Sequence, residues 1–118
     1  MKDDQRKMYE MYGLQIQHEI EQREAFLQDL IVTIEAVRTM KEQNILFPVG
    51  RLVYGHAKVT DPDTFIVPVG GGYMVKKRKD ELVEHLNRIV DLEVKHVQVL
   101  SQNLNAVVDK LRSMNSDE

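Results

Sequence analysis

Apolar residues in the first third of the chain return at alternating steps of three and four, which is typical of a helix that packs along a seam. Tyr9 and Gly13 extend this register towards the N-terminus, and Arg23 occupies one of its positions. The apolar members of the series are Ile16, Ile20, Leu27, Leu30, Ile34 and Val37. Because one helix cannot bury such a stripe alone, we expect a partner helix.

The last third carries a matching pattern, with an apolar residue at every seventh position. The two interleaved series are Val83, Val90, Val97, Leu104 and Leu111, and Leu86, Glu93, Leu100 and Val107. We expect residues 1–43 and 76–118, the latter including a short acidic tail, to form a long antiparallel two-helix coiled coil. Its layers would pair Val37 near Val83 and Ile16 near Leu104.

This pairing brings Arg23 and Glu93 within about one helical turn of each other. Two interpretations stay open at this point. The two side chains form an ion pair in the seam, or each extends separately to solvent.

The middle of the chain has a different composition, because residues 44–75 hold all three prolines and five of the six glycines. Four short β-rich stretches are predicted there, at 44–49, 52–59, 64–69 and 73–75. Asp61-Pro62-Asp63 predicts a turn, and Gly70-Gly71-Gly72 predicts a second reversal of the chain. Since proline cannot donate a ladder hydrogen bond, Pro48 and Pro68 mark edges, bulges or strand ends.

The predicted fold class is therefore α+β, with two β-hairpins inserted between the helices of a coiled coil. Two hairpins have little interior of their own. Their apolar faces and edges predict assembly with other chains.

Composition narrows the function classes. The chain has 118 residues, no cysteine and a net charge of −3, which disfavours a general nucleic-acid binder and excludes disulfides and thiolate zinc sites. No apolar run approaches the roughly 20 residues of a membrane span. The first residues lack the apolar segment of a secretory signal, so we expect a cytoplasmic protein.

Candidate chemistry is sparse. The triple glycine lacks the residues of a phosphate-binding loop, so a hairpin turn is favoured. Glu81 and His85 share a helix face, but two ligands do not make a zinc site, and a solvated pair is favoured. No Ser-His-Asp arrangement can be argued from spacing. We expect no catalytic residues, no metal, no cofactor and no enzyme activity.

The run Lys76–Lys79 is the one basic cluster, and it meets the predicted start of the last helix, where Asp80 would be the N-cap. A solvated junction is favoured over a contact with an anionic partner.

The predicted helix ends carry more apolar residues than a seam requires. The two ends meet at one tip in an antiparallel hairpin, far from the predicted strands. Their residues either close the coiled coil or form a surface for promiscuous apolar binding, which flexible methionine suits. The candidates for such binding are Met8, Met11, Tyr12, Val108, Leu111 and Met114.

The order of long helix, two β-hairpins and long helix resembles the α class of prefoldin subunits, whereas the β class has one hairpin. The residues that carry the resemblance are Phe47-Pro48-Val49-Gly50, Ala57-Lys58-Val59-Thr60-Asp61, Val67-Pro68-Val69-Gly70-Gly71-Gly72-Tyr73 and Val75-Lys76-Lys77. The charge at Arg51 and the proline at Pro68 depart from the family pattern.

The resemblance implies a hexamer of two α and four β subunits, joined through a β-barrel platform. It implies an ATP-independent chaperone that holds non-native proteins at the coiled-coil tips and passes them to a group II chaperonin. The hairpin residues expected at the oligomer interface are Ile45, Phe47, Val49, Leu52, Tyr54, Phe65, Val67, Val69 and Tyr73. The first alternative function is a self-assembling filament subunit. The second is a small enzyme or a nucleotide-binding regulator.

Overall fold

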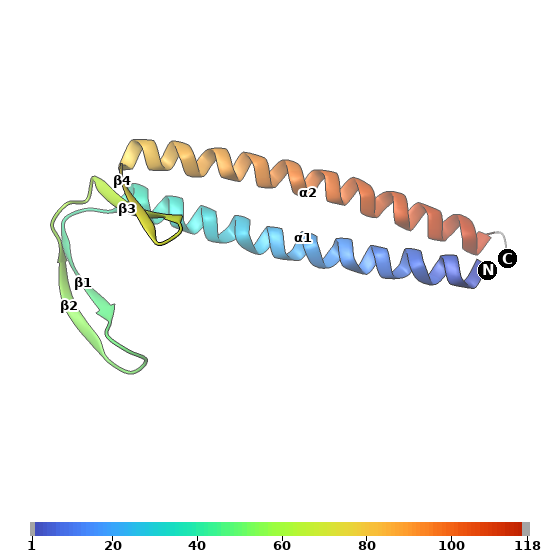
Figure 1. Cartoon of the computed structure of the whole chain (residues 1–118), viewed down its shortest axis with the longest axis horizontal. Coiled ribbons are helices and arrows are strands. Elements are labelled where there is room, and N and C mark those ends of the chain that lie inside the picture. Colours follow the sequence, from blue (N-terminus) through green and yellow to red (C-terminus); the bar gives the residue numbers. More distant parts are fainter. Residues whose placement is uncertain (1, 117–118) are drawn as a thin grey trace. The chain divides into compact units, whose positions relative to one another are not determined.

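Residues 2–116 are described in the structure, a computed structural model. The predicted fold class is confirmed, since two long helices flank two β-hairpins (Figure 1). The predicted acidic tail, Asp117 and Glu118, lies outside the described residues. The elements are α1 (Lys2–Thr39), β1 (Gln43–Pro48), β2 (Tyr54–Val59), β3 (Thr64–Gly70), β4 (Tyr73–Arg78) and α2 (Lys79–Ser116).

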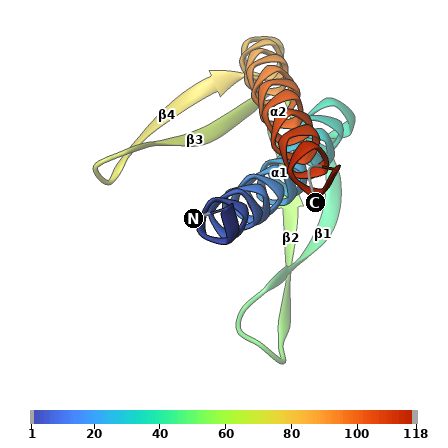
Figure 2. The ribbon, with the colours of Figure 1, turned by 90° about the vertical axis from the view of Figure 1, so that its right-hand side faces the viewer.

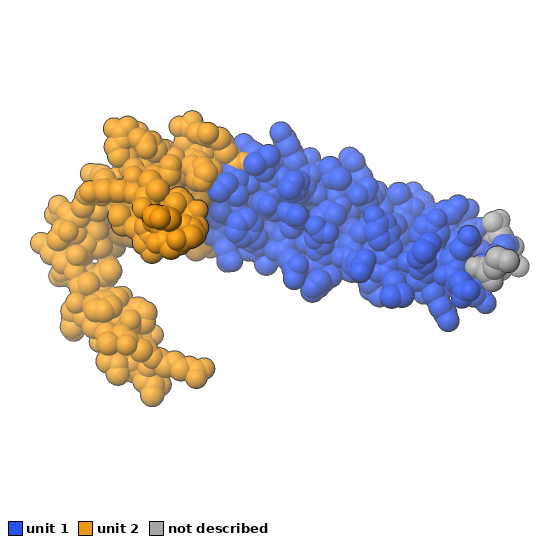
Figure 3. Space-filling view, viewed as in Figure 1, with its two compact units in different colours: residues 1–31, 89–118 blue, residues 32–88 orange. Residues whose placement is uncertain are grey.

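The chain divides into two compact units (Figure 3). Unit 1 comprises residues 1–31 and 89–118, and unit 2 comprises residues 32–88. Within unit 1, the first part of α1 and the later part of α2 run antiparallel and side by side (Figures 1 and 2). Unit 2 holds both hairpins together with the end of α1 and the start of α2.

The heptad pattern explains the packing of unit 1. Ile16, Leu30 and Val107 are buried there, and each occupies a predicted seam position. Gly13 lies close to the other helix, because a Cβ atom at this position would be 3.4 Å from Val107 Cγ1 and 3.9 Å from Leu104 Cδ1. This contact lies within one turn of the predicted layer between Ile16 and Leu104. In unit 2, Ile34, Val37 and Leu82 are buried.

The first hairpin pairs β1 with β2 in antiparallel register, with Ile45 opposite Ala57 and Phe47 opposite Gly55. A Cβ atom at Gly55 would lie 2.8 Å from Phe47 Cζ, so the glycine leaves room for the aromatic ring across the strand. Val49 N donates a hydrogen bond of 2.9 Å to Val53 O and closes the connecting loop.

The second hairpin pairs β3 with β4 and reverses at the triple glycine, as predicted. All three glycines have positive φ (100°, 60° and 79°), which side chains disfavour and glycine adopts readily. The register shifts between Pro68 and Gly70, and Pro48 is the last residue of β1. The prediction that these prolines mark a bulge and a strand end is confirmed. Figure 2 shows the hairpins as two separate ribbons.

The start of α2 differs from the prediction. Lys76–Arg78 belong to β4, because Lys76 pairs with Ile66 and Arg78 pairs with Thr64. The helix therefore begins at Lys79, and Asp80 lies in its first turn instead of capping it. The Asp80 carboxylate accepts a hydrogen bond of 3.0 Å from Glu81 N. Likewise, α1 ends at Thr39, before the predicted boundary at residue 43.

Lys79 ties three parts of unit 2 together. Its backbone N donates a hydrogen bond of 2.8 Å to Asp63 O in the turn between the hairpins. Its ammonium group donates a bond of 3.0 Å to Met40 O, just after α1. The turn itself is fixed by Asp61, whose carboxylate accepts hydrogen bonds from the Thr64 hydroxyl and from Asp63 N.

Candidate functional site

One layer of the seam in unit 1 is polar. Arg23 Nη1 donates hydrogen bonds to both carboxylate oxygens of Glu93, at 3.0 and 3.2 Å, so the ion-pair interpretation is confirmed. Nη1 also lies 2.9 Å from His96 Nδ1, which must accept because a guanidinium only donates. Hydrogen bonding to Glu93 raises the pKa of Arg23 above its ordinary value. This layer holds the two helices together through charge instead of apolar contact.

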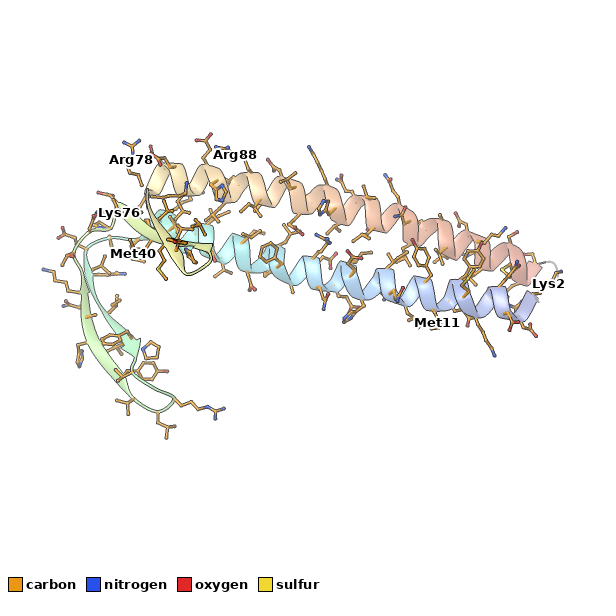
Figure 4. The ribbon with its side chains drawn as sticks, in the orientation of Figure 1. Lys2, Met11, Met40, Lys76, Arg78 and Arg88 are labelled. Carbon is orange, nitrogen blue, oxygen red and sulfur yellow. The ribbon has the colours of Figure 1, made fainter. Side chains whose placement is uncertain are left out.

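The predicted tip residues of α1 lie on the solvent side of the helix. Met8 is 59% exposed, Met11 67% and Tyr12 49%, which is unusual for three large apolar side chains within two turns. Together with Tyr9 and Gln15 they line a surface depression of about 340 Å³. Figure 4 shows Met11 projecting from α1. We refer to Met8, Met11 and Tyr12 as the apolar patch.

The predicted tip residues of α2 are placed differently. Leu111 and Met114 fall on seam positions and are half-buried, whereas Val108 is exposed. Met114 lines a second depression, of about 180 Å³, with residues from both helices. The structure thus brings the end of α2 beside the start of α1. The side chains of the apolar patch are the more exposed ones, whereas the seam partly covers Leu111 and Met114.

The predicted interface residues of the hairpins are largely open to solvent. Phe65 and Val67 are half-buried, and the others are exposed, up to 75% for Tyr73 and 92% for Leu52. Each hairpin is a two-stranded sheet, so the outer edges of both strands present unpaired backbone N–H and C=O groups in addition to the exposed apolar side chains. These faces can therefore bind further polypeptide.

Comparison with known proteins identifies the family. A family model described as "Prefoldin subunit" matches residues 9–117. The chain belongs to the prefoldin family. It is 28% identical over 106 residues to "Prefoldin subunit alpha" of Thermofilum pendens (strain DSM 2475 / Hrk 5), covering 86% of this chain and 82% of that protein.

The fold is shared with a solved prefoldin. The cryo-EM structure of filamentous PFD from Methanocaldococcus jannaschii superimposes with a TM-score of 0.80 at 18% identity, covering 98% of this chain and 99% of that chain. Prefoldin subunits are chaperones without enzymatic activity.

Other features of this prefoldin subunit bear on its chemistry. Within the part of the chain that the structure describes, no group of three His, Cys, Asp or Glu side chains could hold a metal ion. Neither helix in residues 2–116 combines the length and apolarity that crossing a bilayer requires. In the basic run, Arg78 pairs with Glu81 at 2.7 Å.

Two sets of residues escaped the sequence reasoning. The first is apolar and exposed on the hairpins: Leu46, Ile66 and Met74. The signal was present, because the consecutive apolar run 45–47 does not alternate and so predicts a strand covered on both faces. The second set is cationic and lines the depression beside Met114: Lys2, Arg6 and Lys110. No local pattern predicts that set, because its members come from opposite ends of the chain.

Proposed function

We propose that this chain is an α-class subunit of an ATP-independent prefoldin, which holds non-native proteins at the ends of its coiled coils and passes them to a group II chaperonin. The observation that carries the proposal is the exposed apolar patch of Met8, Met11 and Tyr12, at the end of unit 1 that contains both described chain ends. Family membership makes a chaperone role the expected one.

The chemistry of the patch suits loose binding of many clients. Methionine is flexible and polarizable, so it adapts to apolar segments of different shapes. Charged neighbours, among them Lys7 and Glu10, surround the patch and keep it hydrated. A single patch binds weakly, but several copies in one assembly raise the effective concentration and retain a client without ATP. The exposed side chain of Val108 would add to the contact with the client. Leu111 and Met114 would contribute through the parts of their side chains that the seam leaves exposed.

Assembly would use the hairpins. We infer that the exposed interface residues join this chain to β-class prefoldin subunits in a hexameric β-barrel platform in the cytoplasm. The exposed apolar area of both hairpins supports this, since such area favours burial against another chain.

A second candidate is a self-assembling, prefoldin-like filament subunit. The likeness in fold to a filamentous prefoldin favours it, although low sequence identity restricts that likeness to the fold. The same hairpin faces would then pair copies of this chain with one another.

Client binding is tested with Met8→Ser, Met11→Ser and Tyr12→Ser combined in the full chain. We expect loss of aggregation suppression on a chemically denatured client, measured by light scattering, with unchanged helicity because the three side chains lie outside the seam. The matched control combines Ile31→Ser, Val32→Ser and Leu92→Ser, which are similarly exposed on the helices. Undiminished suppression by the patch variant would refute the proposed contact.

The partner question is decided by native mass spectrometry of the chain alone and mixed with a β-class subunit. A particle with two copies of this chain and four of the partner supports the hexamer. Long particles formed by this chain alone support the filament candidate.

A further inference from the structure

The depression beside Met114 is cationic. Lys2, Gln5 and Arg6 of α1 line it together with Lys110 and Met114 of α2, and its volume is about 180 Å³. No Asp or Glu of residues 2–116 is among its lining residues. Three cations around one hollow are unexpected in a chain whose net charge is −3. We refer to this hollow as the basic pocket.

The basic pocket, on the side of α1 that meets α2, and the apolar patch, on its solvent side, are neighbours along the helix. Gln5 lines the pocket and Tyr9 lines the depression of the patch, and residues four apart lie one above the other on a helix. Figure 4 labels Lys2 and Met11, which project from this same stretch of α1. Both hollows belong to unit 1.

The side chains that line the basic pocket favour a negative ligand. Lys2 and Lys110 are both exposed and present mobile ammonium groups at the pocket. The pocket also adjoins the first turn of α1, where the helix dipole is positive. The acidic residues of that turn, Asp3 and Asp4, do not line the pocket.

We propose that this end of the coiled coil recognises extended polypeptide segments in which a carboxylate lies close to large apolar side chains. The apolar residues would occupy the patch, and the carboxylate would bind Lys2 and Lys110 in the basic pocket. The inference rests on the proposed function and adds a substrate class to it, namely acidic-apolar segments of non-native proteins.

The geometry sets the spacing of such a segment. The pocket residues and patch residues of α1 are centred about six positions apart, which is ~9 Å along a helix. An extended chain spans that axial distance in about three residues, so the favoured carboxylate lies at least about three positions from the apolar anchor. A carboxylate ten positions away would gain nothing from the pocket.

The test uses fluorescence anisotropy with the full chain and three labelled peptides that share one apolar core. Three positions from the core, the peptides carry two aspartates, two serines or two lysines. We expect the acidic peptide to bind about three- to tenfold more tightly than the serine peptide, and the lysine peptide to bind more weakly than both. The preference should shrink at high salt, because these charges are exposed.

Two variants identify the source of the preference. Lys2→Gln with Lys110→Gln should abolish it while leaving affinity for the serine peptide unchanged. Lys41→Gln with Lys95→Gln changes the net charge equally, away from the pocket, and should preserve it. Equal binding of the acidic and serine peptides to the unmodified chain, survival of the preference in the first variant, or its loss in both variants would overturn the inference. Absence of binding by every peptide would instead overturn the proposed function.

Discussion

Single residues in unit 1 decide how the two helices recognise each other. The Arg23 side chain is 31% exposed and that of Glu93 is 15% exposed, so this ion pair is only partly hydrated. Partial burial of the pair costs desolvation free energy, which the attraction between the charges and their hydrogen bonds offsets when the geometry is favourable. Its position in an otherwise apolar seam makes it a determinant of register as well as of stability.

We expect Arg23→Leu or Glu93→Leu alone to lower the urea midpoint, because each leaves a partly buried charge without its partner on the other helix. The effect of Glu93→Leu should be the smaller, since Arg23 keeps its ion pair with Glu19 at 3.3 Å on its own helix. The double Leu variant should be at least as stable as the unmodified chain, because apolar contact replaces the pair. Urea denaturation followed by circular dichroism, at equal protein concentration, measures the midpoints of the single and double variants. A double variant less stable than either single one would show that the pair stabilises the seam more than apolar contact does.

The turn between the hairpins depends on one carboxylate. The hydrogen bond from the Thr64 hydroxyl, followed by that from Asp63 N, lowers the pKa of Asp61 below its ordinary value. Because the folded state binds this proton less tightly than the unfolded state, the ionised carboxylate stabilises the fold above the ordinary pKa. That contribution is lost as the pH falls through the lowered pKa.

Asp61→Asn should therefore reduce the thermal midpoint at pH 7, and the difference from the unmodified chain should shrink at pH values below about 4. Melting curves from pH 7 to acid measure this. Thr64→Val should behave similarly, since it removes the largest cause of the shift. A difference that stays constant with pH would contradict the role of ionisation.

At the scale of elements, the seam sets how closely α1 and α2 approach. A methyl group at Gly13 would lie at ordinary contact distance from Val107 and Leu104. Glycine inside a helix also costs about 1 kcal/mol relative to alanine.

We expect Gly13→Ala to stabilise unit 1 by about 0.5–1 kcal/mol, because helix propensity improves without a clash. Gly13→Leu should destabilise it, because the larger side chain would push the helices apart. Chemical denaturation compares the two. Stabilisation by both variants would mean that the helices do not approach closely here.

The buried and exposed faces of α1 provide a second element-scale prediction. Leu30→Ala should cost about 2–4 kcal/mol, since Leu30 is buried in the seam. Val32→Ala, two residues away on the exposed face, should change stability by less than about 0.5 kcal/mol. Similar losses in both would argue against the observed orientation of the helix.

At the scale of the whole molecule, the hairpins carry apolar residues on more faces than a single contact would need. Ile66 and Met74 lie on the opposite side of the second hairpin from Phe65, because side chains alternate along a strand. Because apolar side chains are exposed on both faces of this hairpin, we expect both faces to be buried in an assembly.

Ile66→Asp with Met74→Asp should leave the chain folded and prevent assembly, because burying the new charges is costly. Size-exclusion chromatography with light scattering should then show the mass of a monomer. Lys58→Glu, which changes charge on β2 without removing apolar area, is the control. Normal assembly of the double variant would restrict the interface to the faces predicted from sequence.

Local patterns in the sequence determined the elements of this protein. The three–four spacing predicted both helices and their antiparallel seam, including the polar layer of Arg23 and Glu93, and glycine and proline placed the hairpin turn and the bulge. The helices, the turn and the bulge depend on residues close together in the chain, so local patterns reveal them. The polar layer followed from aligning two matching seam patterns in an antiparallel hairpin. The helix start at Lys79 was missed because pairing with β3 draws Lys76–Arg78 into a strand.

Only the tertiary structure decided how far each side chain of the helix ends is exposed. Leu111 and Met114 belong to the seam, whereas Met8 and Met11 face solvent. Lys110 meets Lys2 and Arg6 at the basic pocket, although these residues lie at opposite ends of the chain. Such a meeting depends on how two helices are rotated about each other, a quantity that the pattern of either helix by itself leaves open.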